Sequence, residues 1–286
     1  MQLIPQDEYA NSVRTLLSPT LPINSIDSIV AAPAFQFQRT SWKSNWFGDV
    51  TPHDAEVYMN LALDLAQAQV AAGAGPLLRE GCVAAGLPPT SADDLGCARG
   101  LIATFAARAY RRPLLNDEQT VLMDAYREGR ASGLADGGVS ALVASVLQAP
   151  QFLYRLELGD GSVATPADSP PTPHELAARL SSLLLADLPD DDLRAAAADH
   201  RLDAAGLRAQ VNRLMADPRT RPVPQRYSVG WLRIDGWDPG GATPTEFPTF
   251  TAQVQRDMLR EIRRFLDHHF WETDSALSPA SSMCTR

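Results

Sequence analysis

Hydrophobic residues recur along this chain mostly at spacings of three and four positions, which is the period of an amphipathic helix. Three such patterns follow one another between residues 97 and 157. The first should end near Arg112, because Pro113 follows and the residue before a proline avoids helical backbone. Its predicted buried face consists of Leu101, Ile102, Phe105, Ala106 and Ala109.

The other two patterns in this stretch have their own start and stop signals. Asn116 is suited to an N-cap position, and Gln119 three residues later completes a capping-box arrangement. A cluster of glycines at positions 133, 137 and 138 separates this helix from a third, which should stop at Pro150. Three amphipathic helices joined by short links are expected to pack on one another.

Further helices are predicted on both sides of this stretch. Thr51 followed by Pro52 is typical of a helix start, and Thr172 with Glu175 forms another capping box. A last helix should run over residues 251–270, with arginines and acids paired on its solvated face. The residues of this helix that we expect to face inward are Val254, Met258, Ile262, Phe265 and Leu266.

The alternation of apolar and polar residues that marks β-strands is nearly absent. The predicted fold class is therefore all-α, with two packed helical modules and irregular loops. Residues 158–171 are rich in Gly, Ser, Pro and Asp and form the clearest linker. We expect an N-terminal module over residues 1–157, with an aromatic loop and the arginine-rich three-helix stretch, and a C-terminal module over residues 172–286.

Composition limits the classes of function. The chain has 286 residues, a net charge of −9 and a pI near 5.0, so it lacks the basic surface of a non-specific nucleic-acid-binding protein. Lys43 is its only lysine, which we interpret as genomic GC bias rather than phosphate recognition. The chain has no run of 18 apolar residues, so no transmembrane helix is predicted. Its first residues lack the basic start of a signal peptide.

A segment between residues 18 and 50 has little helical pattern and gathers large aromatic residues. Trp42, Trp46 and Phe47 are candidates for a surface that stacks on a sugar or a polymer, together with Phe35 and Phe37. The alternative, which we favour, is a loop that inserts these aromatic side chains into the helical core.

Two cysteines, Cys82 and Cys97, flank a loop rich in proline and glycine. Their spacing is too wide for the redox motif CxxC, and zinc would need two further ligands. A disulfide and two buried thiols both remain open, and Cys284 is left over. The haem-attachment motif CxxCH is absent, so no covalent haem, and no other cofactor, is predicted for this chain.

Three arginines cluster at the end of the first helix in the 97–157 stretch. Arg108, Arg111 and Arg112 could share one side of that helix and clamp it to others through Glu118 and Glu157. Because arginine forks suit carboxylates, the alternative is a binding site for an anion or a uronate.

Other charged groups fit structural roles better than catalytic ones. The acids at 190, 191 and 192 follow Pro189 at a helix start, where carboxylates cap free N–H groups, so we favour capping over a metal site. His268 and Glu272 are spaced four residues apart, but two ligands at a helix end make a weak metal signal. No nucleophile elbow, zinc motif, phosphate loop or dinucleotide fingerprint occurs, so no catalytic residue and no metal site is predicted.

Two runs of residues in the 97–157 stretch carry a family resemblance. Residues 108–114 with Glu118, and then residues 149–157, resemble a module of large exported proteins known mainly from planctomycetes and myxobacteria. Those proteins are built from consecutive domains of unknown function, and some also carry c-type cytochrome domains. The opening residues 4–17 and the segment from Arg179 to Arg219 resemble neighbouring modules of the same family, but Ser182 and Leu185 stand where aromatic residues are usual.

The resemblance implies an exported protein that resides in the periplasm or on the cell surface, of which this chain is a fragment lacking the export signal. It also favours a disulfide between Cys82 and Cys97, because the family has paired cysteines before its arginine-rich helix. The function it implies is a scaffold or binding role near c-type cytochrome domains or polymer-degrading partners, with polysaccharide as a candidate ligand. The alternative is an extracytoplasmic oxidoreductase or hydrolase whose active site needs a further C-terminal domain.

Overall fold

The computed structural model of the chain describes residues 2–31, 51–73, 75–134, 136–162, 169–231 and 249–272. Within these ranges nearly all regular structure is helical, which confirms the all-α prediction. The strands β1 and β2 are two residues long and pair antiparallel, with Gln2 opposite Arg155 and Leu3 opposite Tyr154. This short ladder joins the start of the chain to the end of the arginine-rich stretch.

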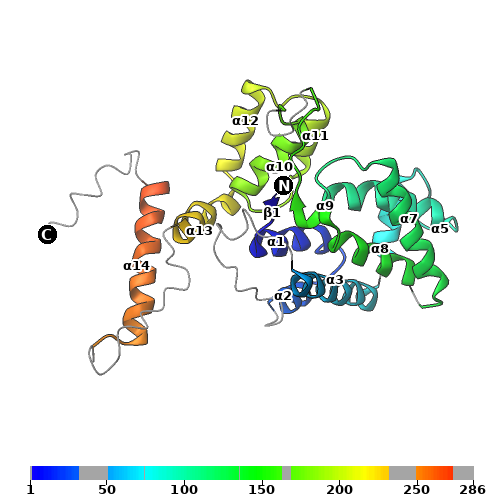
Figure 1. The fold of residues 1–286 in the computed structure, drawn as a ribbon, viewed down its shortest axis with the longest axis horizontal. Helices are drawn as coiled ribbons and strands as arrows, with labels where there is room; N and C mark the ends of the chain where they lie inside the picture. Colours follow the sequence, from blue (N-terminus) through cyan, green and yellow to red (C-terminus); the bar gives the residue numbers. More distant parts are fainter. Residues whose placement is uncertain are drawn as a thin grey trace.

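Helix α1 lies near the middle of the molecule, with α2 and α3 beside it and with α5, α7 and α8 further to one side (Figure 1). The first core cluster draws on α1, α2, α3 and the helices from α5 to α9, and its largest buried side chains include Tyr9 and Phe152, whose ring centroids lie 5.3 Å apart. The elements of the N-terminal half are α1 (Gln6–Leu17), α2 (Ile23–Val30), α3 (Pro52–Ala72), α4 (Gly75–Ala84), α5 (Asp94–Leu101), the π-helical turn η2 (Ile102–Ala106), α6 (Ala107–Ala109), α7 (Asn116–Ala131), α8 (Gly137–Leu147) and α9 (Pro150–Leu153).

The second half of the chain begins after β2 (Tyr154–Arg155) and forms a second, smaller core cluster from α10 and the two helices that follow it. Leu188, in the turn between α10 and α11, belongs instead to the first cluster, so this half also contributes to the first core. The elements are α10 (Pro173–Leu184), α11 (Asp191–Ala198), α12 (Ala204–Met215), the 3₁₀ turn η3 (Pro218–Thr220), α13 (Pro222–Trp231) and α14 (Ala252–Trp271).

Helix starts are set by the short polar side chains that the sequence places there. Thr51 caps α3 and Thr172 caps α10, as predicted, and each does so in a complete capping box, which was predicted only for Thr172. The predicted cap of α7 is wrong by one residue: Leu115 is the N-cap, and its N–H donates to Glu118 Oε2 at 2.8 Å. Glu118 rather than Gln119 therefore reaches back to the helix start.

The helix predicted to end near Arg112 is shorter and less regular. All five of its predicted core residues are buried, but regular helix ends at Ala109 and η2 interrupts it. The hydroxyl of Thr104, inside η2, donates to the carbonyl of Gly100 at 3.0 Å, and such back-bonding competes with the helical ladder. Arg111 then has a φ of 63°, in the left-handed region.

Helices α4 and α5 are in unusually close contact. A Cβ atom at Gly100 would overlap the carbonyl oxygen of Gly81, so the two backbones can approach this closely only because both residues are glycine. A disulfide between Cys82 and Cys97 joins the same pair of helices, with the two Cα atoms 3.9 Å apart.

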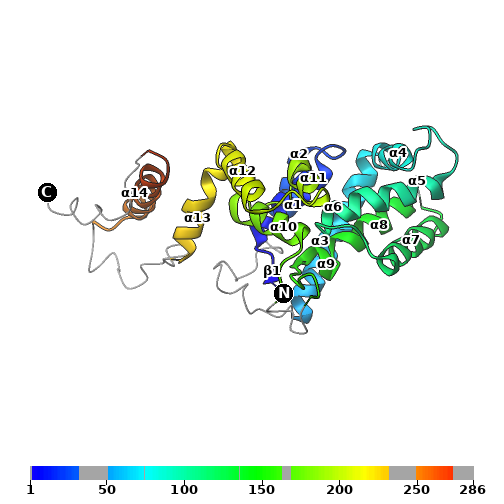
Figure 2. The ribbon, with the colours of Figure 1, turned by 90° about the horizontal axis from the view of Figure 1, so that it is seen from above.

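Helix α14 stands away from the other helices and is reached through α13 (Figures 1 and 2). The prediction that its apolar residues face inward is wrong for three of them: Val254 is 38% exposed, and Met258 and Phe265 are each 39% exposed. Leu266 is the buried member of the predicted set, because among the described elements α13 alone packs strongly against this helix.

Candidate functional site

A group of buried charges lies where α1, the chain after α6 and the end of α10 meet. Arg111 is at its centre, and its side chain is 4% exposed. Its Nη1 donates to the carbonyl of Phe152 at 3.1 Å, and its guanidinium lies 5.7 Å from the centroid of the Phe152 ring. The left-handed backbone of Arg111 turns the chain out of the helix just before Pro113, and it places this arginine apart from Arg108 and Arg112.

Glu8 on α1 is the counter-charge of Arg111. Its side chain is 2% exposed, and Oε1 lies 4.0 Å from Arg111 Nη2. Its other oxygen, Oε2, accepts a hydrogen bond from the Ser182 hydroxyl at 2.7 Å. Ser182 in turn accepts from the Arg155 guanidinium, which also donates to Gln2 Oε1. These contacts connect α1, β1, β2 and α10, and we call Glu8, Arg111, Arg155 and Ser182 the junction network.

Burial dominates the electrostatics of this network. It raises the pKa of Glu8, against the opposing influence of Arg111, the Ser182 hydrogen bond and Arg155. Burial likewise lowers the pKa of Arg111, against the opposing influence of Glu8. A buried ion pair of this kind adds little net stability, but removal of one partner is costly because it leaves the other charge buried and unpaired.

A second buried acid, Asp187, continues the network about two turns further along the same side of α1. Its Oδ2 accepts from the Thr15 hydroxyl at 2.6 Å, and its Oδ1 accepts from the N–H of Leu188 at 2.7 Å. Burial raises its pKa, with the Thr15 and Leu188 hydrogen bonds opposing that shift. Arg108 contributes a bond from Nη2 to the Thr15 carbonyl at 3.3 Å, so Thr15 links α1 both to Asp187 and to the chain at Arg108.

Two partners were predicted for the arginine cluster, and the structure confirms Glu118 but not Glu157. Arg112 forms two hydrogen bonds with Glu118, at 2.9 and 2.7 Å, as expected. Burial tends to raise the pKa of Glu118, but Arg112 and the Leu115 N–H together bring it below its usual value. Glu157, the other predicted partner, pairs instead with Arg155 and with Arg179, whose Nε and Nη2 each lie 2.8 Å from a carboxylate oxygen.

Polar contacts join the start of the predicted linker to α10. Glu157, just before the linker, forms an ion pair with Arg179 on that helix. Glu175, also on α10, accepts hydrogen bonds at Oε1 from the N–H groups of Leu158 and Gly159 at 2.6 and 3.1 Å. The residues at the start of the segment 158–171 are therefore hydrogen-bonded to the helix that follows this segment.

The other candidate residues have varied positions. Trp42, Trp46 and Phe47 lie outside the described residues, as does Cys284. Asp190 caps α11 and accepts two hydrogen bonds from Arg213, at 2.8 and 2.9 Å, which matches the structural role favoured for it. His268 Nδ1 lies 2.9 Å from Glu272.

In the described parts of the chain, no group of three or more His, Cys, Asp or Glu side chains is arranged to hold a metal ion. None of the helices described is both long enough and apolar enough to cross a membrane.

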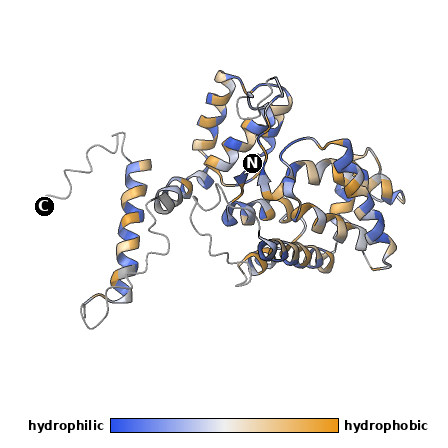
Figure 3. Cartoon of the chain, viewed as in Figure 1, coloured by the Kyte–Doolittle hydropathy of each residue, from blue (hydrophilic) through white to orange (hydrophobic). Residues whose placement is uncertain are grey.

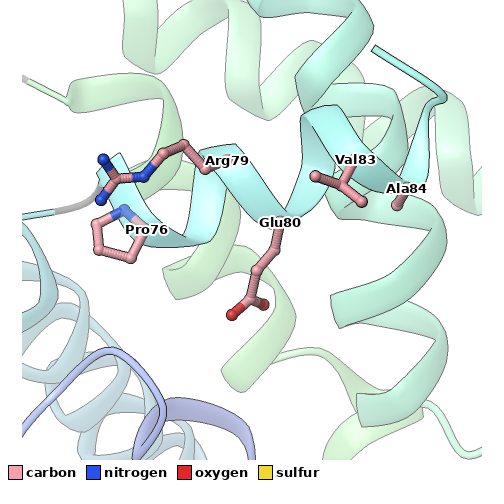
Figure 4. Close-up of a pocket in the computed structure, with 5 residues that line it drawn as sticks. All are labelled: Pro76, Arg79, Glu80, Val83 and Ala84. Carbon is pink, nitrogen blue, oxygen red and sulfur yellow. The ribbon is translucent and has the colours of Figure 1, made fainter. Parts of the chain in front are cut away.

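One hollow on the surface was not predicted. It is lined by Pro76, Arg79, Glu80, Val83 and Ala84, all from α4 (Figure 4). Because one helix supplies every side chain, the hollow has no opposing wall from which groups could converge on a ligand.

The sequence analysis did not single out Glu8, Arg155, Ser182 or Asp187 as site residues. Only Glu8 carried a local signal: it lies four residues before Ser12 and eight before Leu16, and all three are buried on one face of α1. A charged residue in the buried stripe of an amphipathic helix indicates a paired interior charge.

Two parts of the chain match known domain families. Residues 97–157 match the family described as PSD5: Protein of unknown function (DUF1595), and residues 172–281 match PSD4: Protein of unknown function (DUF1592). No curated protein and no solved structure matches the chain. The chain therefore contains two consecutive domains of unknown function, as the resemblance implied, and the junction network connects their matched segments through Arg155 and Ser182.

Proposed function

We propose that this pair of consecutive domains is a non-catalytic scaffold or binding segment of an exported multidomain protein. The observation that supports this most directly is the use of the buried charges. Glu8, Arg111 and Asp187 lie inside the molecule rather than at a cleft. Each forms a hydrogen bond with a residue of another segment of the chain. Buried charges of this kind fix how helices are arranged.

Export is part of the same proposal. The disulfide between Cys82 and Cys97 favours an oxidising compartment, since such bonds are rare in reducing ones. We infer a periplasmic or cell-surface location, beside c-type cytochrome domains or polymer-degrading partners, from the family resemblance. Mass spectrometry of the protein purified under non-reducing conditions from its native host should find the cross-linked peptide pair; two free thiols there would count against export.

Polysaccharide is the candidate ligand of this proposal, and the aromatic segment with Trp42, Trp46 and Phe47 is its candidate site. The competing role, which the sequence favours, is insertion of these rings into the core. The full chain should bind a polysaccharide panel without turning any member over, with or without added divalent metal. Trp42→Ala combined with Trp46→Ala should abolish binding with an unchanged thermal midpoint if the rings form the site, whereas a lowered thermal midpoint would support core insertion. Tyr227→Ala is the matched control, because it removes an aromatic ring that is 51% exposed elsewhere.

The arginine cluster leads to a second test, which compares the binding of acidic and neutral glycans. An acidic glycan should bind no better than a neutral one, because Arg111 is buried against Glu8 and Arg112 is engaged by Glu118. Glycan turnover by the chain would refute the scaffold proposal and favour a hydrolase, and loss of acidic-glycan binding in Arg112→Ala with unchanged stability would favour an anion site.

A further inference from the structure

Helix α14 carries an apolar stripe that is partly exposed among the residues that the structure describes. Val254, Met258 and Phe265 are spaced four and seven residues apart, so they lie on one side of the helix. In Figure 3, α14 shows apolar and polar residues in alternation along its length, at a distance from the main body. An amphipathic helix of this kind normally buries such a stripe.

The contact with α13 uses a neighbouring face of α14. Leu266 and His269 are buried there, Gln225 Nε2 donates to the carbonyl of Arg263 at 3.0 Å, and Trp271 Nε1 donates to the carbonyl of Arg221 at 3.2 Å. The stripe lies beside this face, on the side that α13 does not cover.

A row of charged residues borders the open side of the stripe. Asp257, Glu261, Arg264 and His268 are exposed and follow one another at spacings of four, three and four, so they share one side of the helix. We call these four residues the charged edge. Its acidic members lie in the first half of the helix and its basic members in the second half.

Because of this order, the charged edges of two copies of α14 are complementary when the two helices run antiparallel. If two copies of α14 pair antiparallel about the point between Ile262 and Arg263, Glu261 of each copy faces Arg264 of the other. Asp257 then faces His268, whose ring Nδ1 also lies 2.9 Å from Glu272 of its own helix, so the Glu261–Arg264 contacts set the orientation. A parallel pair would instead place each charge opposite its own copy, which is repulsive. Charge order therefore selects the antiparallel pair.

The apolar stripe is compatible with the same alignment. A helix rises 1.5 Å per residue, so Met258 of one copy lies within about 3 Å, along the axis, of Phe265 of the other. Two-fold symmetry repeats each contact, as in other isologous interfaces.

We propose that the chain forms a homodimer in which the α14 helices of two copies pack antiparallel through this stripe and its charged edge. A single helix of 20 residues gives a small interface, so the dissociation constant should be on the order of micromolar or weaker. Sedimentation equilibrium of the full chain from about 1 to 500 µM should therefore show a monomer–dimer equilibrium.

Charge reversal tests the orientation. Glu261→Arg and Arg264→Glu should each weaken the dimer by about tenfold or more, since each places like charges opposite one another twice. An equimolar mixture of the two variants should restore association, because each of the two contacts then joins an arginine to a glutamate: the introduced Arg at 261 faces the introduced Glu at 264, and the native Arg264 faces the native Glu261. A contact within one helix cannot produce this rescue in the mixture.

Two further variants complete the test. Arg256→Glu, on the far side of the helix, makes the same charge change as Arg264→Glu and should leave the dimer within about twofold. Phe265→Gln should shift the chain to monomer, and circular dichroism should show unchanged helix content. A chain that stays monomeric up to about 500 µM, a dimer that ignores all α14 variants, or a failure of the mixture to associate would each overturn the proposal.

Discussion

Replacement of Arg111 by methionine should be among the most destabilising single changes in the junction network. Methionine keeps much of the volume and the contact with the Phe152 ring, but it removes the charge 4.0 Å from Glu8 and the donor to the Phe152 carbonyl. Removal of one partner from a buried pair costs about 3–5 kcal/mol. Arg127→Met is the control, because that arginine is exposed in a pair with Asp124, and it should change stability by less than about 0.5 kcal/mol.

The double-mutant cycle with Glu8→Gln separates this pair from its surroundings. Glutamine can still accept the Ser182 hydrogen bond, so the substitution removes mainly the charge. Each single variant leaves one buried charge without its partner, whereas the double variant leaves neither. The double variant should therefore lose less free energy of unfolding than the sum of the singles, by about 1–3 kcal/mol in urea unfolding at pH 7. Additive losses would refute the coupling.

The pH dependence gives an independent check. Burial raises the pKa of Glu8 above its usual value of 4.5, so its contribution to stability is full below that value and is lost as pH rises through the folded pKa. Without Arg111 the pKa of Glu8 should rise further, and the pKa of Asp187, which burial also raises, should move the same way. The stability difference between wild type and Arg111→Met should therefore shrink on acidification towards pH 4.5. A difference that stays constant or grows would refute the assignment.

Three further changes test other parts of the fold. Alanine at both Cys82 and Cys97 should lower the free energy of unfolding by about 3 kcal/mol, as should reduction of the wild type, since the bond closes a loop with a sequence separation of 15. Gly100→Ala should lower the thermal midpoint by several degrees, because its Cβ would overlap the backbone of α4, whereas Gly75→Ala meets no atom within 4 Å and should not. Arg112→Ala should cost about 1 kcal/mol in urea unfolding, because its partner at the start of α7 is only partly buried.

Local features of this protein were predictable because they depend on residues a few positions apart. The caps at Thr51 and Thr172 follow from a hydroxyl and an acid three residues later, and the structure has both. The apolar period correctly placed Leu101, Phe105 and their neighbours in the core. The end of that helix was misplaced, because Pro113 limits how far a helix can run but does not fix where it stops.

Choices among distant partners could not be predicted in this way. Glu157 was expected to pair with an arginine near residue 111, but β2 and α10 bring Arg155 and Arg179 closer to it. The stripe of α14 was expected to be buried, but a stripe specifies only that a helix prefers a partner, and not whether the same chain supplies one.

The sequence by itself determined the helical class, several helix starts and which faces are apolar, because a helix is built from contacts within about four residues. The tertiary structure alone decided that Glu8, Arg111 and Ser182 meet, since 174 residues separate Glu8 from Ser182. No local period encodes such a meeting. It follows from the packing of α1 between two helical regions, which excludes water and makes the pairing of charges from distant segments necessary.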